Sequence, residues 1–104
     1  MLSDDECLDL NDKSENDLKD IYNKKLNELT AFDLHSLVAG VTGTKERMLA
    51  TYKQNQQDWV QYRNNYCELI STQAQGTHAF TENMLSCVLN MNKIRGDQIR
   101  MITP

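Results

Sequence analysis

The segment QQDWVQYRNNYC, residues 56–67, lies within the strongest structural pattern of the chain. Around it, side chains recur in steps of three and four residues, the spacing of one face of an α-helix. The row consists of Met48, Tyr52, Asn55, Trp59, Tyr62, Tyr66 and Leu69. Asn55 is its one fully polar member, so its amide is expected to be hydrogen-bonded or to lie toward solvent. The row predicts a helix from about Lys45 to Thr72, packed nearly antiparallel against its neighbours.

A first helix is expected to begin after Ser14, because Ser14 and Asp17 resemble a short capping box. Its apolar positions are Leu18, Ile21, Tyr22, Leu26, Leu29 and Phe32. The pattern fades at Leu37, and the two glycines of residues 38–44 indicate a connector with Thr44 as the next N-cap. Residues 1–13 are then expected to form a loose N-terminal arm.

A third helix is expected after a short turn over residues 73–78, with Thr77 as its N-cap. Its apolar positions are Phe80, Met84, Cys87, Val88, Met91 and Ile94, followed by Ile99, Met101 and Ile102 in a final turn. Gly96 weakens this helix by about 1 kcal/mol relative to alanine. Short connections make consecutive helices antiparallel neighbours.

The composition agrees with a helical fold. One proline and four glycines are few for a strand-rich chain, which needs more turn residues. At 104 residues the chain is the size of one domain with a single core. We therefore predict an all-α, antiparallel three-helix bundle that forms a single domain over residues 1–104.

Charge is unevenly distributed along the chain. Residues 1–36 contain ten acids and four bases, whereas residues 37–104 contain five acids and seven bases. The acidic part argues against a nucleic-acid partner, which requires a basic surface. It suits a cationic protein partner, and it equally suits a surface that only confers solubility. No apolar stretch approaches the roughly 18 residues of a membrane-spanning helix.

Two cysteines fall on the second and third helices. In an antiparallel hairpin that turns near Gly76, Cys67 and Cys87 lie at similar levels. They could form a disulfide, which would stabilise the fold by roughly 3 kcal/mol. Two buried, reduced thiols are the other interpretation, and the spacing leaves both open.

No catalytic or metal-binding pattern is evident. The two histidines, His35 and His78, lie in different segments without further ligands at metal-binding spacing. Ser36 beside His35 is not a nucleophile arrangement, since adjacent helix positions do not face each other. We expect neither an enzyme nor a cofactor.

The chain resembles the LprI-type lysozyme-inhibitor family over roughly residues 7–99. The resemblance rests on Gln56-x2-Trp59-x2-Tyr62-Arg63-x3-Cys67, followed by Gly76, Cys87 and Arg95, and more weakly on Tyr22 and Leu26-Asn27. Members are small helical proteins of the bacterial envelope. The resemblance implies a periplasmic or secreted protein whose leader has been removed, and it favours a disulfide between Cys67 and Cys87.

Cys7 departs from the family pattern. Family members often have a second cysteine pair, one before the first helix and one eleven residues later. Cys7 occupies the first position, but Leu18 stands at the second. We therefore expect Cys7 to be a free thiol in a loose arm or the site of an intermolecular bridge.

The resemblance implies a binding protein that blocks a lysozyme or a related wall-cutting hydrolase. The motif residues Gln56, Trp59, Tyr62, Arg63, Gly76 and Arg95 are expected to be mainly structural. Hydrolases of this kind use two carboxylates in a cleft, so an inhibitor would offer a protruding loop. The candidate loop residues are Gly40, Thr42, Gly43, Gln75, Thr77 and His78. The alternative is a helical interaction module that docks on another envelope protein, including a toxin, or associates with itself.

Overall fold

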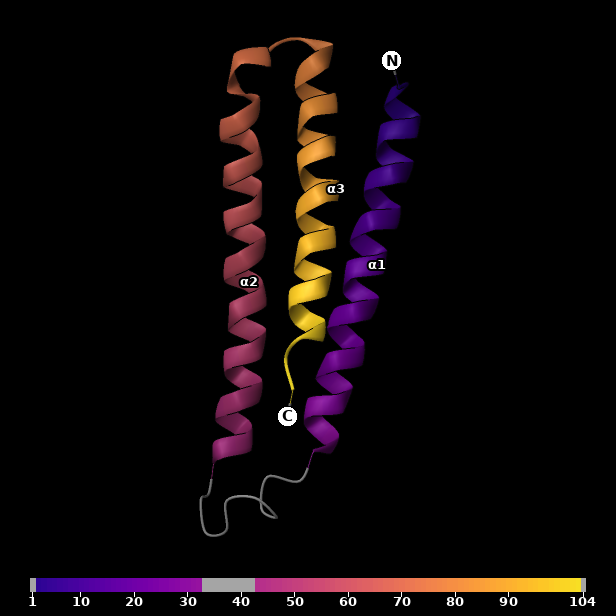
Figure 1. Ribbon diagram of the computed structural model, residues 1–104. Helices are drawn as coiled ribbons and strands as arrows, with labels where there is room; N and C mark the ends of the chain where they lie inside the picture. The colour runs from indigo at the N-terminus through magenta and orange to yellow at the C-terminus, as the bar shows by residue number, and fades with distance from the viewer. Residues whose placement is uncertain (1, 33–42, 104) are drawn as a thin grey trace.

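The computed structural model describes residues 2–32 and 43–103, most of which lie in three long α-helices. These helices are α1 (Asp4–Ala31), α2 (Thr44–Ser71) and α3 (His78–Arg100), and a 3-10 turn, η2 (Thr72–Ala74), joins α2 to α3. Figure 1 shows α3 between the other two, antiparallel to α2 and parallel to α1. The described residues contain no strand, so the prediction of an all-α, three-helix fold is confirmed.

The first helix begins eleven residues earlier than predicted. Ser3 is its N-cap: the Ser3 hydroxyl accepts from the Glu6 N–H at 3.1 Å, and the Glu6 carboxylate accepts from the Ser3 N–H at 3.3 Å. Asp4, Asp5 and Glu6 then fill the first turn, where negative charge stabilises a helix. The predicted loose arm is therefore wrong for residues 4–13, because Ser3 caps α1 and the acidic run stabilises its first turn.

Two buried clusters hold the helices together. The larger consists of Leu18, Leu29, Tyr52 and Ile99, and the smaller of Cys67, Cys87 and Val88. The rings of Tyr52 and Tyr22 stack at 4.7 Å, and the Tyr52 hydroxyl donates to the Tyr22 carbonyl at 2.9 Å. Burial, reinforced by the neighbouring Tyr22, raises the pKa of Tyr52 to about 12, so the hydroxyl keeps its donor proton.

The buried face of α2 differs from the predicted row. Tyr52 is buried as expected, but Tyr62, Tyr66 and Leu69 are exposed. The buried positions further along α2 are Arg63, Cys67 and Ser71, spaced by four residues. A row that alternates strictly by three and four drifts around a straight helix, because 3.6 residues make one turn. On α3, Ile94 is likewise half exposed, whereas the polar Asn92 and Arg95 are buried.

The helix caps partly agree with expectation. Gly43, with φ 76°, is the N-cap of α2, and Thr44 is its first residue rather than its cap. Thr77 is the N-cap residue of α3 as predicted, but its hydroxyl donates to the Ala74 carbonyl at 2.6 Å instead of capping the helix. Gly76, with φ 84°, supplies the left-handed turn that glycine adopts without strain. None of the described helices is long and apolar enough to span a membrane.

Gly96 is buried where α3 packs on α1, and a Cβ there would lie 3.0 Å from Ile21 Cδ1. Gly96→Ala is expected to change the unfolding free energy by less than about 1 kcal/mol, because improved helix propensity offsets a small shift of Ile21. Gly96→Leu is expected to destabilise by roughly 2–3 kcal/mol through overpacking. Urea denaturation measures both. Equal stability of the two variants would mean that α1 does not pack closely at this position.

Candidate functional site

The disulfide joins α2 to α3 close to the turn that connects these helices. Cys67 and Cys87 are bonded, with their Cα atoms 5.5 Å apart, and Cys67 is completely buried. The disulfide that the family resemblance favoured is therefore present. It closes the hairpin near η2, so the exposed turn is held on a covalently linked pair of helices.

A buried polar layer connects all three helices. Arg63 Nη1 donates to Glu15 Oε1 at 2.5 Å and to Asn92 Oδ1 at 2.8 Å. Asn92 Nδ2 in turn donates to the Ser14 hydroxyl at 2.9 Å and to the same Glu15 oxygen at 2.8 Å. Arg63 and Asn92 are both buried, so each depends on these partners.

A second polar layer lies further along the bundle. Arg95 donates from Nε to Gln56 Oε1 at 2.9 Å and from Nη2 to Asn55 Oδ1 at 2.5 Å. The Asn55 amide thus has the hydrogen-bond partner that its position in the row required. Burial lowers the pKa of Arg95 from its ordinary value, with Tyr52 opposing the shift.

Trp59 lies between the two arginines. The guanidinium carbon of Arg63 is 5.4 Å from the indole ring and that of Arg95 is 5.5 Å from it, within cation–π range. The structure thus brings together Gln56, Trp59, Arg63 and Arg95, which the sequence marked as a motif. Tyr62 points away from this cluster with 60% of its surface exposed, and Gly76 lies in the α2–α3 turn. The clustered motif residues build the bundle interior.

Sequence reasoning missed several members of the polar layers. Ser14 was assigned to a helix cap, yet it lies inside α1 and accepts from Asn92. Asn92 was overlooked because only apolar residues were sought on the buried face of α3. Periodicity alone would have identified Asn92. Buried positions on one face of a helix recur every three or four residues whatever their polarity, and on α3 these positions are Val88, Asn92, Arg95 and Ile99.

Cys7 is a free thiol buried in α1, not part of a loose arm. It lies in a groove between α1 and α3 together with Leu85 and Val88. Burial raises the pKa of the Cys7 thiol, and the carboxylates of Glu82, Asp4 and Glu6 reinforce the shift. Since the thiolate is the reactive form, both effects protect the sulfur.

We expect a thiol reagent such as 5,5′-dithiobis(2-nitrobenzoate) to label native Cys7 at least about 100-fold more slowly than the unfolded chain. Absorbance at neutral pH follows the reaction, and a Cys7→Ala variant supplies the blank. Labelling at the unfolded rate would show that the first turns of α1 open readily in solution.

The candidate loop residues do not form one surface. Gly40 and Thr42 lie outside the described residues, and Gly43 begins α2 at the end of the bundle opposite the α2–α3 turn. Gln75 is exposed at that turn. His78 Nε2 lies 3.1 Å from the Leu2 carbonyl and 3.4 Å from Glu82 Oε1, so this ring ties α3 to the chain before α1.

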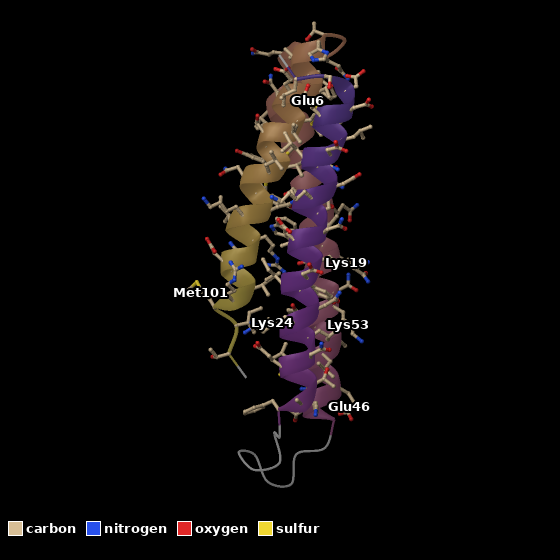
Figure 2. The ribbon with its side chains drawn as sticks, turned by 90° about the vertical axis from the view of Figure 1, so that its right-hand side faces the viewer. Glu6, Lys19, Lys24, Glu46, Lys53 and Met101 are labelled. Atoms are coloured by element: carbon tan, nitrogen blue, oxygen red, sulfur yellow. A yellow bond between two sulfur atoms is a disulfide. The ribbon has the colours of Figure 1, made fainter. Side chains whose placement is uncertain are left out.

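The folded bundle is electrically polarised along its length of 58 Å. The turn end, defined as residues 2–20 and 57–97, holds twelve acids and five bases. The opposite end, defined as residues 21–32, 43–56 and 98–103, holds two acids and six bases. Figure 2 shows Glu6 near one end and Lys24 and Lys53 toward the other. The α2–α3 turn therefore projects from the acidic end.

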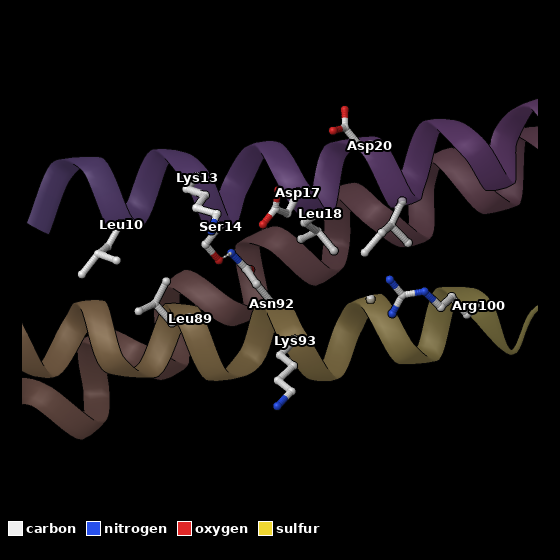
Figure 3. Close-up of a pocket in the computed structure, with 12 residues that line it drawn as sticks. Leu10, Lys13, Ser14, Asp17, Leu18, Asp20, Leu89, Asn92, Lys93 and Arg100 are labelled. Carbon is white, nitrogen blue, oxygen red and sulfur yellow. Dashed lines mark hydrogen bonds between the residues drawn. The ribbon is translucent and has the colours of Figure 1, made fainter.

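A groove of about 540 Å³ runs between α1 and α3. Figure 3 shows Asn92 reaching Ser14 across it, while Asp20 and Lys93 point away from it. Among the described residues, no group of three His, Cys, Asp or Glu side chains is placed to hold a metal ion.

Comparison with known proteins agrees with the helical fold and the disulfide. The model of the family described as lysozyme inhibitor LprI matches residues 4–99. No curated protein and no solved structure gives a significant match. Because the family match covers most of the helical bundle, including the disulfide and both arginine layers, the chain belongs to the LprI lysozyme-inhibitor family.

Proposed function

We propose that this protein is a periplasmic or secreted binding protein that blocks a cell-wall hydrolase by protein–protein contact. The family match over residues 4–99 carries the proposal. The Cys67–Cys87 disulfide supports it, because such bonds persist in oxidising compartments such as the periplasm. The protein acts as a binding partner and not as an enzyme.

The α2–α3 turn is the part of the bundle that enters the hydrolase cleft. The bundle measures 58 × 22 × 16 Å, so the turn stands at one narrow end of a rod. Of the candidate residues at the turn, Gln75 has an exposed amide, whereas Thr77 and His78 have internal partners. An amide donor suits a cleft with two carboxylates. The acidic charge of this end attracts a cationic hydrolase and favours approach with the turn leading.

The test is inhibition of c-type lysozyme on a cell-wall substrate by the purified, oxidised protein. We expect inhibition at a 1:1 ratio, lost when Cys67–Cys87 is reduced. Gln75→Ala is expected to raise the inhibition constant about tenfold, the effect of losing one hydrogen bond to a charged group. Gln57→Ala is the control, because Gln57 is exposed on α2 away from the turn.

The electrostatic attraction is tested separately, through the salt dependence of the association rate. The association rate is expected to fall about tenfold between 50 and 300 mM salt, because exposed charges are screened within roughly a Debye length. A flat salt dependence would remove the steering role of the acidic end. Failure of the oxidised protein to inhibit would instead leave a helical interaction module with a different partner.

A further inference from the structure

An apolar row lies exposed on α2 close to the turn. The α2 stripe, as we name it, consists of Tyr62, Tyr66, Leu69 and Ile70, whose exposed fractions are 60%, 42%, 73% and 53%. Their spacing of four, three and one residues places them on one side of the helix. The described residues have eight exposed large hydrophobic side chains, and these four fall within nine consecutive positions. Such a concentration is typical of an interaction site.

The stripe is organised before any partner binds. The rings of Tyr62 and Tyr66 are stacked, with centroids 6.0 Å apart and planes 13° from parallel. Ile70 lies just before η2, so the stripe continues directly into the α2–α3 turn. Tyrosine is enriched at binding hot spots, because its ring buries a large area at low entropic cost.

The accessible charges on the part of α2 that carries the stripe are negative. In the part of α2 that carries the stripe, residues 57–71, the charged residues are Asp58, Arg63 and Glu68. Arg63 is buried and hydrogen-bonded to Glu15. A protein that docks on the stripe therefore meets a segment of α2 with two carboxylates and no accessible positive charge.

A second copy of the chain does not fit this segment. Two stripes packed against each other across a twofold axis would bring two α2 segments together, and neither has an accessible cation within residues 57–71 to pair with Asp58 or Glu68 of the other copy. Like charges brought together at an interface oppose association. The stripe is also a small cluster, the size of an interface centre rather than of a whole dimer interface.

We infer that the α2 stripe is the main docking surface for a cationic protein that presents an apolar patch rimmed by lysine and arginine. The inference rests on the proposed function, in which that protein is the inhibited hydrolase. The turn enters the cleft, and the stripe packs beside it on the hydrolase surface. Apolar contact at the stripe holds the complex, while the surrounding carboxylates select the basic rim.

The test compares two multiple variants for binding to c-type lysozyme by isothermal titration calorimetry. The stripe variant carries Tyr62→Gln, Tyr66→Gln, Leu69→Gln and Ile70→Gln. The control carries Leu8→Gln and Met101→Gln, whose parent side chains are 59% and 80% exposed on α1 and just after α3. Glutamine is a good helix former, so circular dichroism is expected to show folded protein in both cases. We expect the stripe variant to bind at least about 100-fold more weakly and the control to bind within about threefold of the wild type.

The outcomes separate this inference from the proposed function. Wild-type inhibition together with unchanged binding by a folded stripe variant would overturn the inference and leave the function standing. Absence of wild-type binding and inhibition would overturn both. Sedimentation equilibrium supplies a further check: a wild-type dimer that the stripe substitutions convert to a monomer would show that a second copy covers the stripe, which contradicts the inference.

Discussion

Replacement of Arg63 by alanine is expected to destabilise the protein by about 3 kcal/mol, the lower end of the range for breaking a buried ion pair. The lower end applies because Glu15 retains 40% of its side-chain exposure and can be solvated when its partner is lost. The substitution also removes the hydrogen bond to Asn92 and the contact with Trp59. Urea denaturation followed by circular dichroism measures the change.

Arg100→Ala provides the matched control. Arg100 also pairs with a carboxylate, that of Asp97, but the two side chains are 61% and 68% exposed. Exposed pairs contribute little, so a change within about 0.5 kcal/mol is expected. Arg63→Met tests the charge separately, because it keeps the apolar stem and should recover part of the loss. If Arg63→Ala and Arg100→Ala were equally stable, the polar layer would not hold the helices together.

Removal of the disulfide is expected to destabilise the protein by about as much as Arg63→Ala does. Cys67→Ala/Cys87→Ala opens a loop with a sequence separation of 20 residues, which corresponds to a loss of roughly 3 kcal/mol on the chain-entropy account. For a chain of this size the expected fall in Tm is roughly 12–24 °C. Thermal denaturation by circular dichroism gives the value directly.

Reduction of the wild-type protein should reproduce this loss, whereas the double-alanine variant should not respond to the reductant. Cys7→Ala serves as the control for general effects of cysteine replacement, and it should retain the full response to reduction. Identical melting curves for oxidised and reduced wild-type protein would show that the helical hairpin does not need its covalent link.

The polar layers explain why the sequence motif predicts the fold but does not indicate the binding surface. Arg63 and Arg95 lie inside the bundle and hold the helices in register through directional hydrogen bonds, and Trp59 packs against both guanidinium groups. Residues fully engaged in this way are not available to a partner. The surfaces that remain for binding are the α2 stripe and the α2–α3 turn. Of the motif residues, only Tyr62 in the stripe and Gly76 in the turn belong to them.

The helical class, the turn at Gly76 and the extent of α2 followed from the sequence, because periodicity and glycine act locally along the chain. The start of α1 could also have been read locally, since Ser3 and Glu6 form a complete capping box. The prediction placed the start at Ser14 instead, because Ser14 and Asp17 resemble a capping box as well. The family resemblance, rather than spacing, decided between a disulfide and two free thiols.

The sequence by itself determined that this chain forms three helices, with the second and third joined by a short turn at Gly76, because helix propensity and turn chemistry depend on residues close together in the chain. Only the tertiary structure decided which face of α2 is buried. That choice depends on Glu15 and Asn92, 48 and 29 residues away from Arg63, which accept its hydrogen bonds and draw a charged side chain into the interior. With Arg63 inside, Tyr62, Tyr66 and Leu69 turn outward and form an exposed apolar surface.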